Sequence, residues 1–168
     1  VEATQSFRAM SLMSAEMPTI PAEAYRTAAE GKVETGLESV DGYKAKKAWG
    51  VKVVETPIAA FTAAVNDDAS KPKYGRLSYT EVIRGGLCGT ERVTFMYLPV
   101  SMMTDRYWLS TIRRNTRLAE ASKGEVREMT WETMEPEIPE GKRARDYLQK
   151  GMAIEFAKGG WYLTKLDS

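Results

Sequence analysis

Two neighbouring segments in the middle of the chain alternate large apolar residues in the way that is typical of β-strands. Val93, Phe95 and Tyr97 occupy every second position of the first segment, and Tyr107 and Leu109 do the same in the second. When large apolar residues repeat with a period of two, they lie on one face of a strand, and the residues between them lie on the other face. Large apolar residues also occupy several intervening positions, so we expect something apolar, either protein or ligand, to cover part of each face.

The same pattern predicts a series of antiparallel strands along the second half of the chain. Glycine-containing turns separate them. The proline-rich stretch 134–140 is predicted to be a loop, because proline lacks the backbone N–H that a central strand needs. The strands are expected at residues 77–84, 91–98, 106–115, 125–132 and part of 152–166.

The first half of the chain is predicted to contain two short helices and one hairpin. The helices are expected at residues 18–30 and 58–66, and the second follows a proline, which is favoured in the first turn of a helix. The hairpin is expected at residues 32–40 and 43–55, with its turn at Asp41–Gly42, a pair that favours tight hairpin geometry.

The second helix has an apolar stripe made by Ile58, Phe61 and Val65, so we expect it to pack against the sheet through that face. Nothing in the sequence reads as a linker between two domains. We therefore predict an N-terminal arm at residues 1–17 and a single domain at residues 18–168.

Composition narrows the class of protein. Of the 168 residues, 43% are hydrophobic and 28% charged, which is typical of a globular chain, and no apolar run is long enough to span a bilayer. The net charge of +1 gives no general attraction to nucleic acid, so we expect no such partner. We expect a soluble protein, and its single cysteine, Cys88, is compatible with a cytoplasmic, periplasmic or secreted location.

The sequence contains no histidine, which removes the commonest general base and transition-metal ligand. Ser-His and Cys-His triads and His-based metal sites are therefore excluded, and the sequence carries no phosphate-binding glycine loop or hydrolase elbow. We expect no metal and no cofactor, and we assign no catalytic residue. Glu125, Glu128 or Glu132 would serve as a general base only if burial raised the pKa of its carboxyl group.

The order of helix, two strands, helix and then antiparallel strands resembles the helix-grip proteins, specifically the START and START-like lipid transfer and polyketide cyclase group. The resemblance covers residues 18–168. It rests on four segments: Trp49–Pro57 leading into the helix at 58–67, Tyr79–Ile83, Asp105–Trp108 and Gly159–Leu163.

The resemblance implies an α+β helix-grip fold, in which a curved antiparallel β-sheet and short helices surround a hydrophobic cavity. Two features depart from the group's pattern. The usual Arg-Asp order appears here as Asp105–Arg106, and the sequence stops where the group has its last strand and long C-terminal helix. The resemblance thus implies a domain truncated at its C-terminus, or a pocket completed by residues 1–30 or by a neighbouring chain.

Aromatic, methionine and lone charged residues in the predicted central strands are the candidate ligand contacts. Each has a structural alternative. Aromatic residues and methionines commonly fill an ordinary core, and Arg106 has Asp105 or Glu128 as a structural ion-pair partner. The basic cluster of Arg113, Arg114 and Arg117 is expected to face solvent. The predicted ligand-binding residues are Phe95, Tyr97, Arg106, Trp108, Met129, Trp131 and Trp161.

We therefore expect a protein that binds, and in some settings transports, a hydrophobic or amphipathic small molecule such as a lipid, sterol or fatty-acid-like compound. Transient membrane contact is compatible with that function, and a dimer is expected if the chain is truncated. An enzyme resembling the polyketide cyclases and aromatases is the alternative, with Arg106, Tyr97 and Tyr107 as its polar residues. An interaction module with a filled interior is the third reading.

Overall fold

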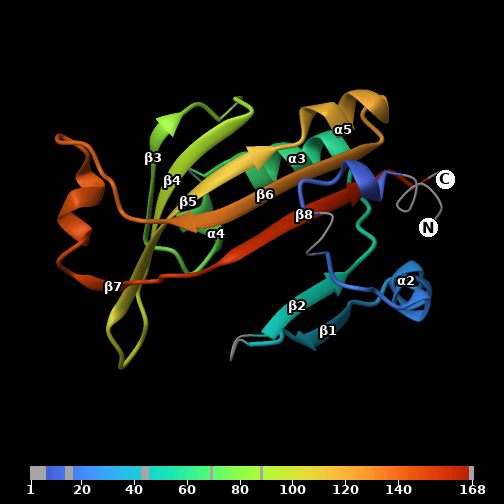
Figure 1. Cartoon of the computed structure of the whole chain (residues 1–168), viewed down its shortest axis with the longest axis horizontal. Coiled ribbons are helices and arrows are strands. Elements are labelled where there is room, and N and C mark those ends of the chain that lie inside the picture. Colours follow the sequence, from blue (N-terminus) through green and yellow to red (C-terminus); the bar gives the residue numbers. More distant parts are fainter. Residues whose placement is uncertain (1–6, 14–16, 43–45, 69, 88, 167–168) are drawn as a thin grey trace.

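The protein, in a computed structural model, is an α+β molecule built around a large antiparallel sheet (Figure 1). The structure describes residues 7–13, 17–42, 46–68, 70–87 and 89–166. The predicted α+β class and the large antiparallel sheet are therefore confirmed.

The N-terminal part contains a short helix and a separate two-stranded sheet. Helix α2 ends before Gly31, whose φ of +82° is a left-handed conformation that glycine adopts without strain. The elements are η1 (Arg8–Met10), α2 (Ala22–Ala29), β1 (Glu34–Ser39) and β2 (Lys46–Val51), and β1 pairs antiparallel with β2. The predicted helix is confirmed over residues 22–29, and the predicted hairpin is confirmed by the pairing of β1 with β2. The second strand was predicted too long: β2 ends at Val51, residues 52–55 are not part of a strand, and residues 43–45 lie outside the described residues.

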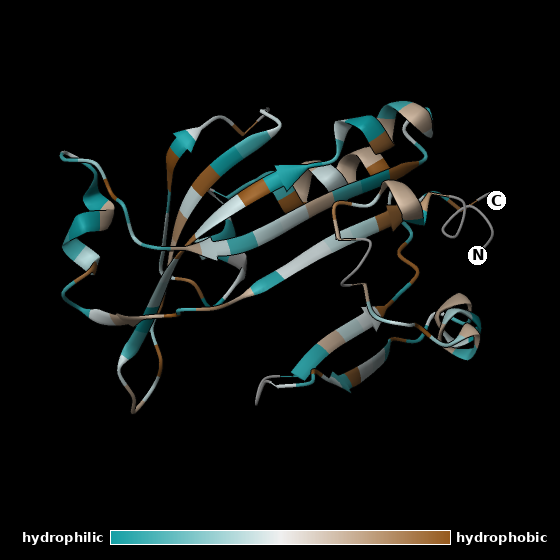
Figure 2. Cartoon of the chain, in the orientation of Figure 1, coloured by the Kyte–Doolittle hydropathy of each residue, from teal (hydrophilic) through white to brown (hydrophobic). Residues whose placement is uncertain are grey.

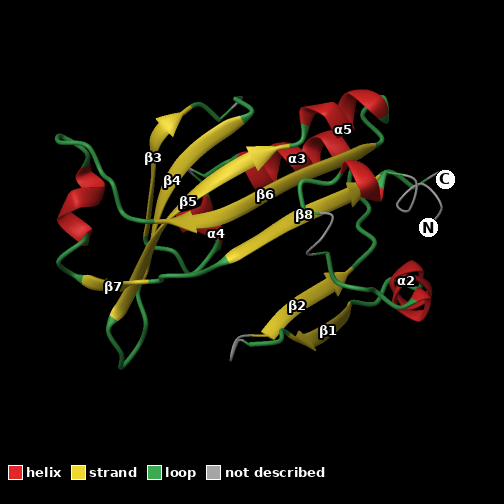
Figure 3. Ribbon diagram, in the orientation of Figure 1, coloured by secondary structure: helices red, strands yellow, loops and turns green. Residues whose placement is uncertain are grey.

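After two further helices, α3 and α4, the chain enters the large sheet (Figure 3). Its strand order is β3-β4-β5-β6-β8, with antiparallel neighbours, while the short β7 pairs in parallel with β5. The elements are α3 (Ile58–Asn66), α4 (Lys71–Tyr74), β3 (Tyr79–Gly85), β4 (Glu91–Leu98), β5 (Asp105–Arg114), α5 (Thr116–Ala121), β6 (Val126–Met134), η2 (Arg143–Tyr147), β7 (Gly151–Ala153) and β8 (Lys158–Thr164).

The strands agree closely with the sequence prediction, but α4, α5 and η2 were not predicted. Each has at most six residues, which is too short for a helical period to emerge from the sequence. In α5 the initiating signal is local, because the Asn115 side chain accepts a hydrogen bond from the Leu118 N–H at 3.0 Å and so caps the first turn.

The register of the strands divides the large sheet into two faces. Because side chains alternate, the residues directly paired across neighbouring strands share a face. Hydrophobic residues lie in the middle of β4 and β5, while charged residues lie at the start of β4 and at both ends of β5 (Figure 2). We call the face on which α3 packs the helix face; it carries Arg92, Thr94, Met96, Arg106, Trp108, Ser110, Ile112, Arg114, Arg127, Met129, Trp131, Trp161 and Leu163.

The opposite face, here the loop face, carries the larger of the two packed cores. Val93, Phe95, Tyr97 and Leu109 are buried there against Ile138 and Ala144 of the segment that connects β6 to β7. Tyr147 of η2 stacks on Tyr79, with ring centroids 4.5 Å apart. The 134–140 segment is thus a loop, as predicted, apart from Met134, which ends β6. Through Ile138 it also covers part of the loop face.

Candidate functional site

The helix face carries a stripe of apolar side chains that crosses the sheet diagonally. Direct strand pairs join Met96 to Trp108 and Met129 to Trp161, and a third pair joins Ile112 to Trp131. The face is packed only in part: Met96, Ile112 and Met129 are buried, whereas 45% of the Trp161 surface is exposed. We call the three tryptophans of this stripe, Trp108, Trp131 and Trp161, the tryptophan stripe.

Helix α3 closes one end of the stripe. The ring of Phe61 meets Trp161 edge to face at a centroid distance of 6.0 Å, and Val65 packs against the cluster of Met96, Ile112 and Met129. Trp161 also lies 6.4 Å from Trp131. Of the predicted packing of α3 through Ile58, Phe61 and Val65, these contacts confirm the part made by Phe61 and Val65. The rings of Phe61, Trp161 and Trp131 form an aromatic wall between helix and sheet.

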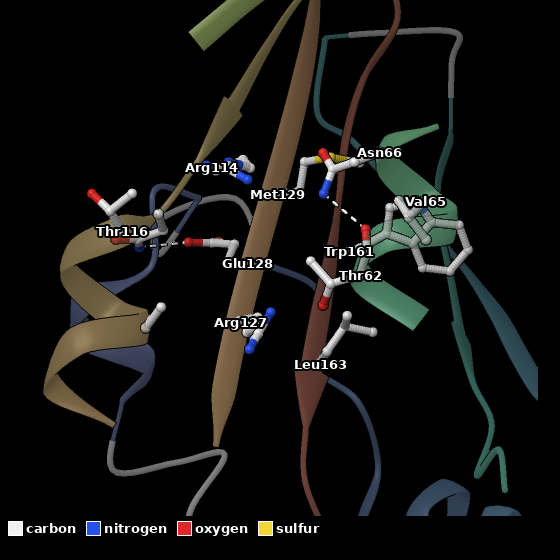
Figure 4. Close-up of a pocket in the computed structure, with 12 residues that line it drawn as sticks. Thr62, Val65, Asn66, Arg114, Thr116, Arg127, Glu128, Met129, Trp161 and Leu163 are labelled. Carbon is white, nitrogen blue, oxygen red and sulfur yellow. Dashed lines mark hydrogen bonds between the residues drawn. The ribbon is translucent and has the colours of Figure 1, made fainter. Parts of the chain in front are cut away.

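A pocket of about 200 Å³ opens at this end of the sheet, between α3, α5 and the strands β6 and β8 (Figure 4). That volume is below the roughly 300–1,000 Å³ of ordinary small-molecule sites, so the pocket is sized for part of a ligand. The lining residues are Thr62, Val65, Asn66, Arg114, Asn115, Thr116, Ala119, Arg127, Glu128, Met129, Trp161 and Leu163.

A buried charged network fixes the end of α3 to the sheet. Arg92 Nε donates to Asp68 Oδ2 at 2.7 Å, and the two side chains are 1% and 2% exposed. Thr94 donates to the same carboxylate at 3.0 Å, and Lys71 pairs with its other oxygen. Burial alone would raise the pKa of Asp68, but hydrogen bonds and charges from Arg92 and Lys71 lower it below its usual value.

The network reaches the pocket through Asn66. Arg92 Nη1 donates to Asn66 Oδ1 at 3.1 Å, and Asn66 Nδ2 donates to the Thr62 carbonyl at 2.8 Å, as the dashed line in Figure 4 marks. The amide therefore has a fixed orientation. Asp68, Arg92 and Asn66 were not predicted as site residues from the sequence. The signal for Arg92 was its position two residues before Thr94, which places two polar side chains on one face of the mainly apolar strand β4.

Glu128 lies on the loop face and is only 6% exposed. Its carboxylate accepts hydrogen bonds from the Leu12 N–H and from Asn115 Nδ2, both at 2.8 Å, and a further one from Ser11. These bonds hold residues 11–12 of the N-terminal arm against the sheet. A buried carboxylate that already accepts three bonds is an anchor for the chain.

Five of the seven predicted ligand-binding residues lie on the helix face. They are Arg106, Trp108, Met129, Trp131 and Trp161. The structure does not bring Phe95 and Tyr97 to them, because these two side chains pack into the core of the loop face. This separation follows from strand alternation, because successive residues point to opposite faces of a sheet. Met96 pairs with Trp108 on the helix face, so its neighbours Phe95 and Tyr97 point to the other face.

Tyr97 is held in that core by a short hydrogen bond. Its hydroxyl donates to Asp105 Oδ2 at 2.5 Å, and this bond together with burial raises the pKa of Tyr97 to about 12. The same bond lowers the pKa of Asp105. Tyr97 pairs directly with Tyr107, and both lie opposite to Arg106, so the three polar residues considered for an enzyme do not converge on one site.

Arg106 lies at the far end of the helix face from the pocket. Its Nη1 donates to the carbonyl of Thr104 at 2.6 Å and to that of Asp105 at 3.4 Å, both in or beside the hairpin that precedes it. Of the basic cluster 113–117, Arg113 pairs with Glu91 at the surface, Arg117 is exposed, and Arg114 lines the pocket.

The described residues contain no helix that is long and apolar enough to cross a membrane. Nor do they contain a cluster of three acidic or cysteine side chains arranged to hold a metal ion.

Comparison with known proteins gave one informative result. No protein-family model matches the chain, and no curated protein sequence matches it. The structure is similar to that of the STAR-related lipid transfer protein (fragment 25–204) from Xanthomonas axonopodis, with a TM-score of 0.61 and 14% sequence identity. The similarity covers 88% of this chain and 72% of that one. At this identity the comparison establishes the fold, and the chain therefore has a START-like fold.

Proposed function

We propose that this protein binds a hydrophobic or amphipathic small molecule, of the lipid, sterol or fatty-acid class, along the tryptophan stripe of the helix face. The observation that carries the proposal is the partial exposure of Trp161, at 45%, beside two further tryptophans that are only half buried. An exposed apolar surface of this kind is unfavourable in water unless something covers it.

A ligand on the stripe is stabilised mainly by removal of apolar surface from water, at roughly 25 cal/mol per Å² before ordering costs. The flat rings of Trp131 and Trp161 offer wide contact areas, and the methionines beside them adapt to an irregular ligand. The START-like fold supports this proposal, because the similar solved structure is described as a lipid transfer protein.

The first test is native mass spectrometry of purified protein, followed by titration with a fluorescent fatty-acid analogue. We expect a co-purified apolar molecule or saturable probe binding. Trp161→Ala should weaken probe binding, because it removes the most exposed ring of the stripe. Trp49→Ala is the matched control, since Trp49 belongs to the separate β1-β2 sheet. Equal binding by both variants, or no binding by the wild type, would overturn the proposal.

Transient membrane contact is the second part of the proposal and is favoured by the hairpin between β4 and β5. Met102 is fully exposed and Met103 is 64% exposed at its tip. Thioether side chains at a loop tip enter the interfacial region of a bilayer readily.

Liposome co-sedimentation tests the membrane contact. Met102→Ser with Met103→Ser should reduce association with neutral phosphatidylcholine vesicles. Leu37→Ser, at a position that is 67% exposed on β1, controls for loss of an exposed apolar residue elsewhere. Vesicle association that is unchanged by the double substitution would refute a role for this tip.

A further inference from the structure

The methionines of the chain differ widely in their exposure to solvent. Met102 is fully exposed and Met103 is 64% exposed, and both lie in the turn between β4 and β5. Met152 of β7 is 57% exposed, whereas Met96 and Met129 are buried on the helix face. A reagent dissolved in water therefore reaches the two sulfur atoms of the turn first.

Met102 has a backbone conformation that methionine rarely adopts. Its φ is +63°, and the Met103 N–H donates to the Val100 carbonyl at 3.2 Å, so residues 100–103 form a β-turn with Met102 at the third position. A positive φ at that position favours glycine or asparagine. The side chain is fully exposed, so no packing within the described residues offsets the steric cost. An unfavourable conformation of this kind indicates a role for the side chain outside the folded chain.

Oxidation changes the polarity of an exposed methionine. A peroxide transfers one oxygen atom to the thioether sulfur, which loses two electrons and becomes a sulfoxide, while the peroxide is reduced to water or an alcohol. The flexible apolar side chain becomes polar. Two adjacent sulfoxides would therefore turn the apolar tip of the hairpin into a polar one, which is unfavourable in the interfacial region of a bilayer.

We propose that Met102 and Met103 form a redox-sensitive modification site, at which oxidation by a peroxide to methionine sulfoxide releases the protein from a membrane surface. This inference rests on the membrane contact proposed above and adds a mode of regulation to it. Neither side chain belongs to the packed cores, so oxidation leaves the fold intact. The change is reversible, because methionine sulfoxide reductases restore the thioether.

Peptide mass spectrometry after brief treatment with dilute hydrogen peroxide tests the modification site. We expect Met102 and Met103 to be oxidised first and Met152 more slowly. Met96 and Met129 should resist oxidation as long as the protein is folded, which circular dichroism of the same samples checks. Oxidation of Met129 as fast as that of Met102 would contradict the proposal.

Liposome co-sedimentation then measures the consequence for membrane contact. The full chain, with Cys88→Ser to remove its single thiol, is oxidised, freed of peroxide with catalase and mixed with saturated phosphatidylcholine vesicles. Oxidation should lower the partition coefficient about 10-fold or more, because burial of one methionine side chain corresponds to about one to two factors of ten in an equilibrium constant. Methionine sulfoxide reductases of both stereospecificities should restore it.

Two leucine variants separate the turn from other sites of oxidation. Met102→Leu with Met103→Leu keeps the turn apolar but removes its sulfur atoms, so vesicle association should persist after peroxide treatment. Met152→Leu removes an exposed sulfur atom outside the turn and should remain as sensitive to peroxide as the wild type.

The outcomes distinguish this inference from the membrane contact on which it rests. Equal association of the oxidised and the reduced wild type would overturn the redox inference and leave the membrane contact standing. The same conclusion would follow if peroxide released the double leucine variant as strongly as the wild type. Lack of association by the reduced wild type would overturn the membrane contact and this inference with it.

Discussion

The buried ion pair between Asp68 and Arg92 gives the sharpest test of how α3 is held to the sheet. Replacement of Asp68 by Asn keeps the shape of the side chain but removes its charge. The Arg92 guanidinium, whose side chain is 1% exposed, is then left without its anionic partner. Removing one partner of a buried pair typically costs about 3–5 kcal/mol of unfolding free energy.

The structure places this estimate toward the upper part of that range. The Asp68 carboxylate also accepts from Thr94 at 3.0 Å and pairs with Lys71, and an amide accepts through only one of its two atoms. Several contacts to a buried charge are therefore weakened together. In contrast, the pair of Arg113 and Glu91 has side chains that are about half exposed, so its loss should cost at most about 1 kcal/mol.

Urea denaturation followed by tryptophan fluorescence measures both effects. We expect Asp68→Asn to lower the midpoint strongly with little change in slope, and Glu91→Gln to lower it slightly. Replacing the pair together, as Asp68→Ala with Arg92→Met, should recover part of the loss, because no buried charge remains unpaired. A loss for Asp68→Asn no larger than that for Glu91→Gln would refute the reasoning.

Three further predictions concern the sheet. Phe95→Ala, at a fully buried position, should cost about 3–5 kcal/mol in chemical denaturation; a loss below 1 kcal/mol would contradict the assigned core. Gly85→Ala should clearly lower the thermal unfolding temperature of the protein, because φ at Gly85 is +79° and an added Cβ would lie 2.6 Å from the Glu91 carbonyl oxygen. Gly86→Ala is the control: an added Cβ there meets open space, so the unfolding temperature should hardly change. The Tyr97–Asp105 bond predicts a stability plateau in pH-dependent denaturation. Its contribution is present above the ordinary carboxyl pKa of 3.8 and is lost as pH falls through the lowered pKa of Asp105. At the alkaline end, the contribution of the bond is present below the ordinary tyrosine pKa of 10.0 and is lost as pH rises toward the Tyr97 pKa of about 12. A Tyr97→Phe variant with the same dependence of stability on pH would exclude this bond as the cause.

The longer strands could be predicted from the sequence because large apolar residues recur at every second position in segments bounded by turn residues. The β4 segment was predicted with both ends correct, since a polar residue and a proline bound its apolar run. Alternation separates the faces within one strand, but it does not relate residues of different strands. The pairing register was needed to show that Trp108, Trp131 and Trp161 share one face while Phe95 and Tyr97 share the other.

The polar part of the site could not be predicted in this way. Asp68 and Arg92 are 24 residues apart, and their pairing depends on where the end of α3 meets β4. Arg114 was interpreted as a solvent-facing member of a basic cluster, because local sequence does not show that α5 follows it and forms a wall beside β6. Long-range contacts of this kind depend on topology, and a local pattern does not record them.

Fluorescence quenching by a doxyl-labelled stearate tests the central claim most directly, because it reports which surface the hydrocarbon touches. Two single-tryptophan variants are compared, in which phenylalanine replaces the other three tryptophans so that the stripe keeps aromatic rings. One variant retains Trp161 on the helix face, and the other retains Trp49 on the β1-β2 sheet. We predict saturable quenching of Trp161, reversed by excess unlabelled stearate, and only weak collisional quenching of Trp49. Equal quenching of the two, or no saturable quenching of Trp161, would contradict ligand binding on the tryptophan stripe.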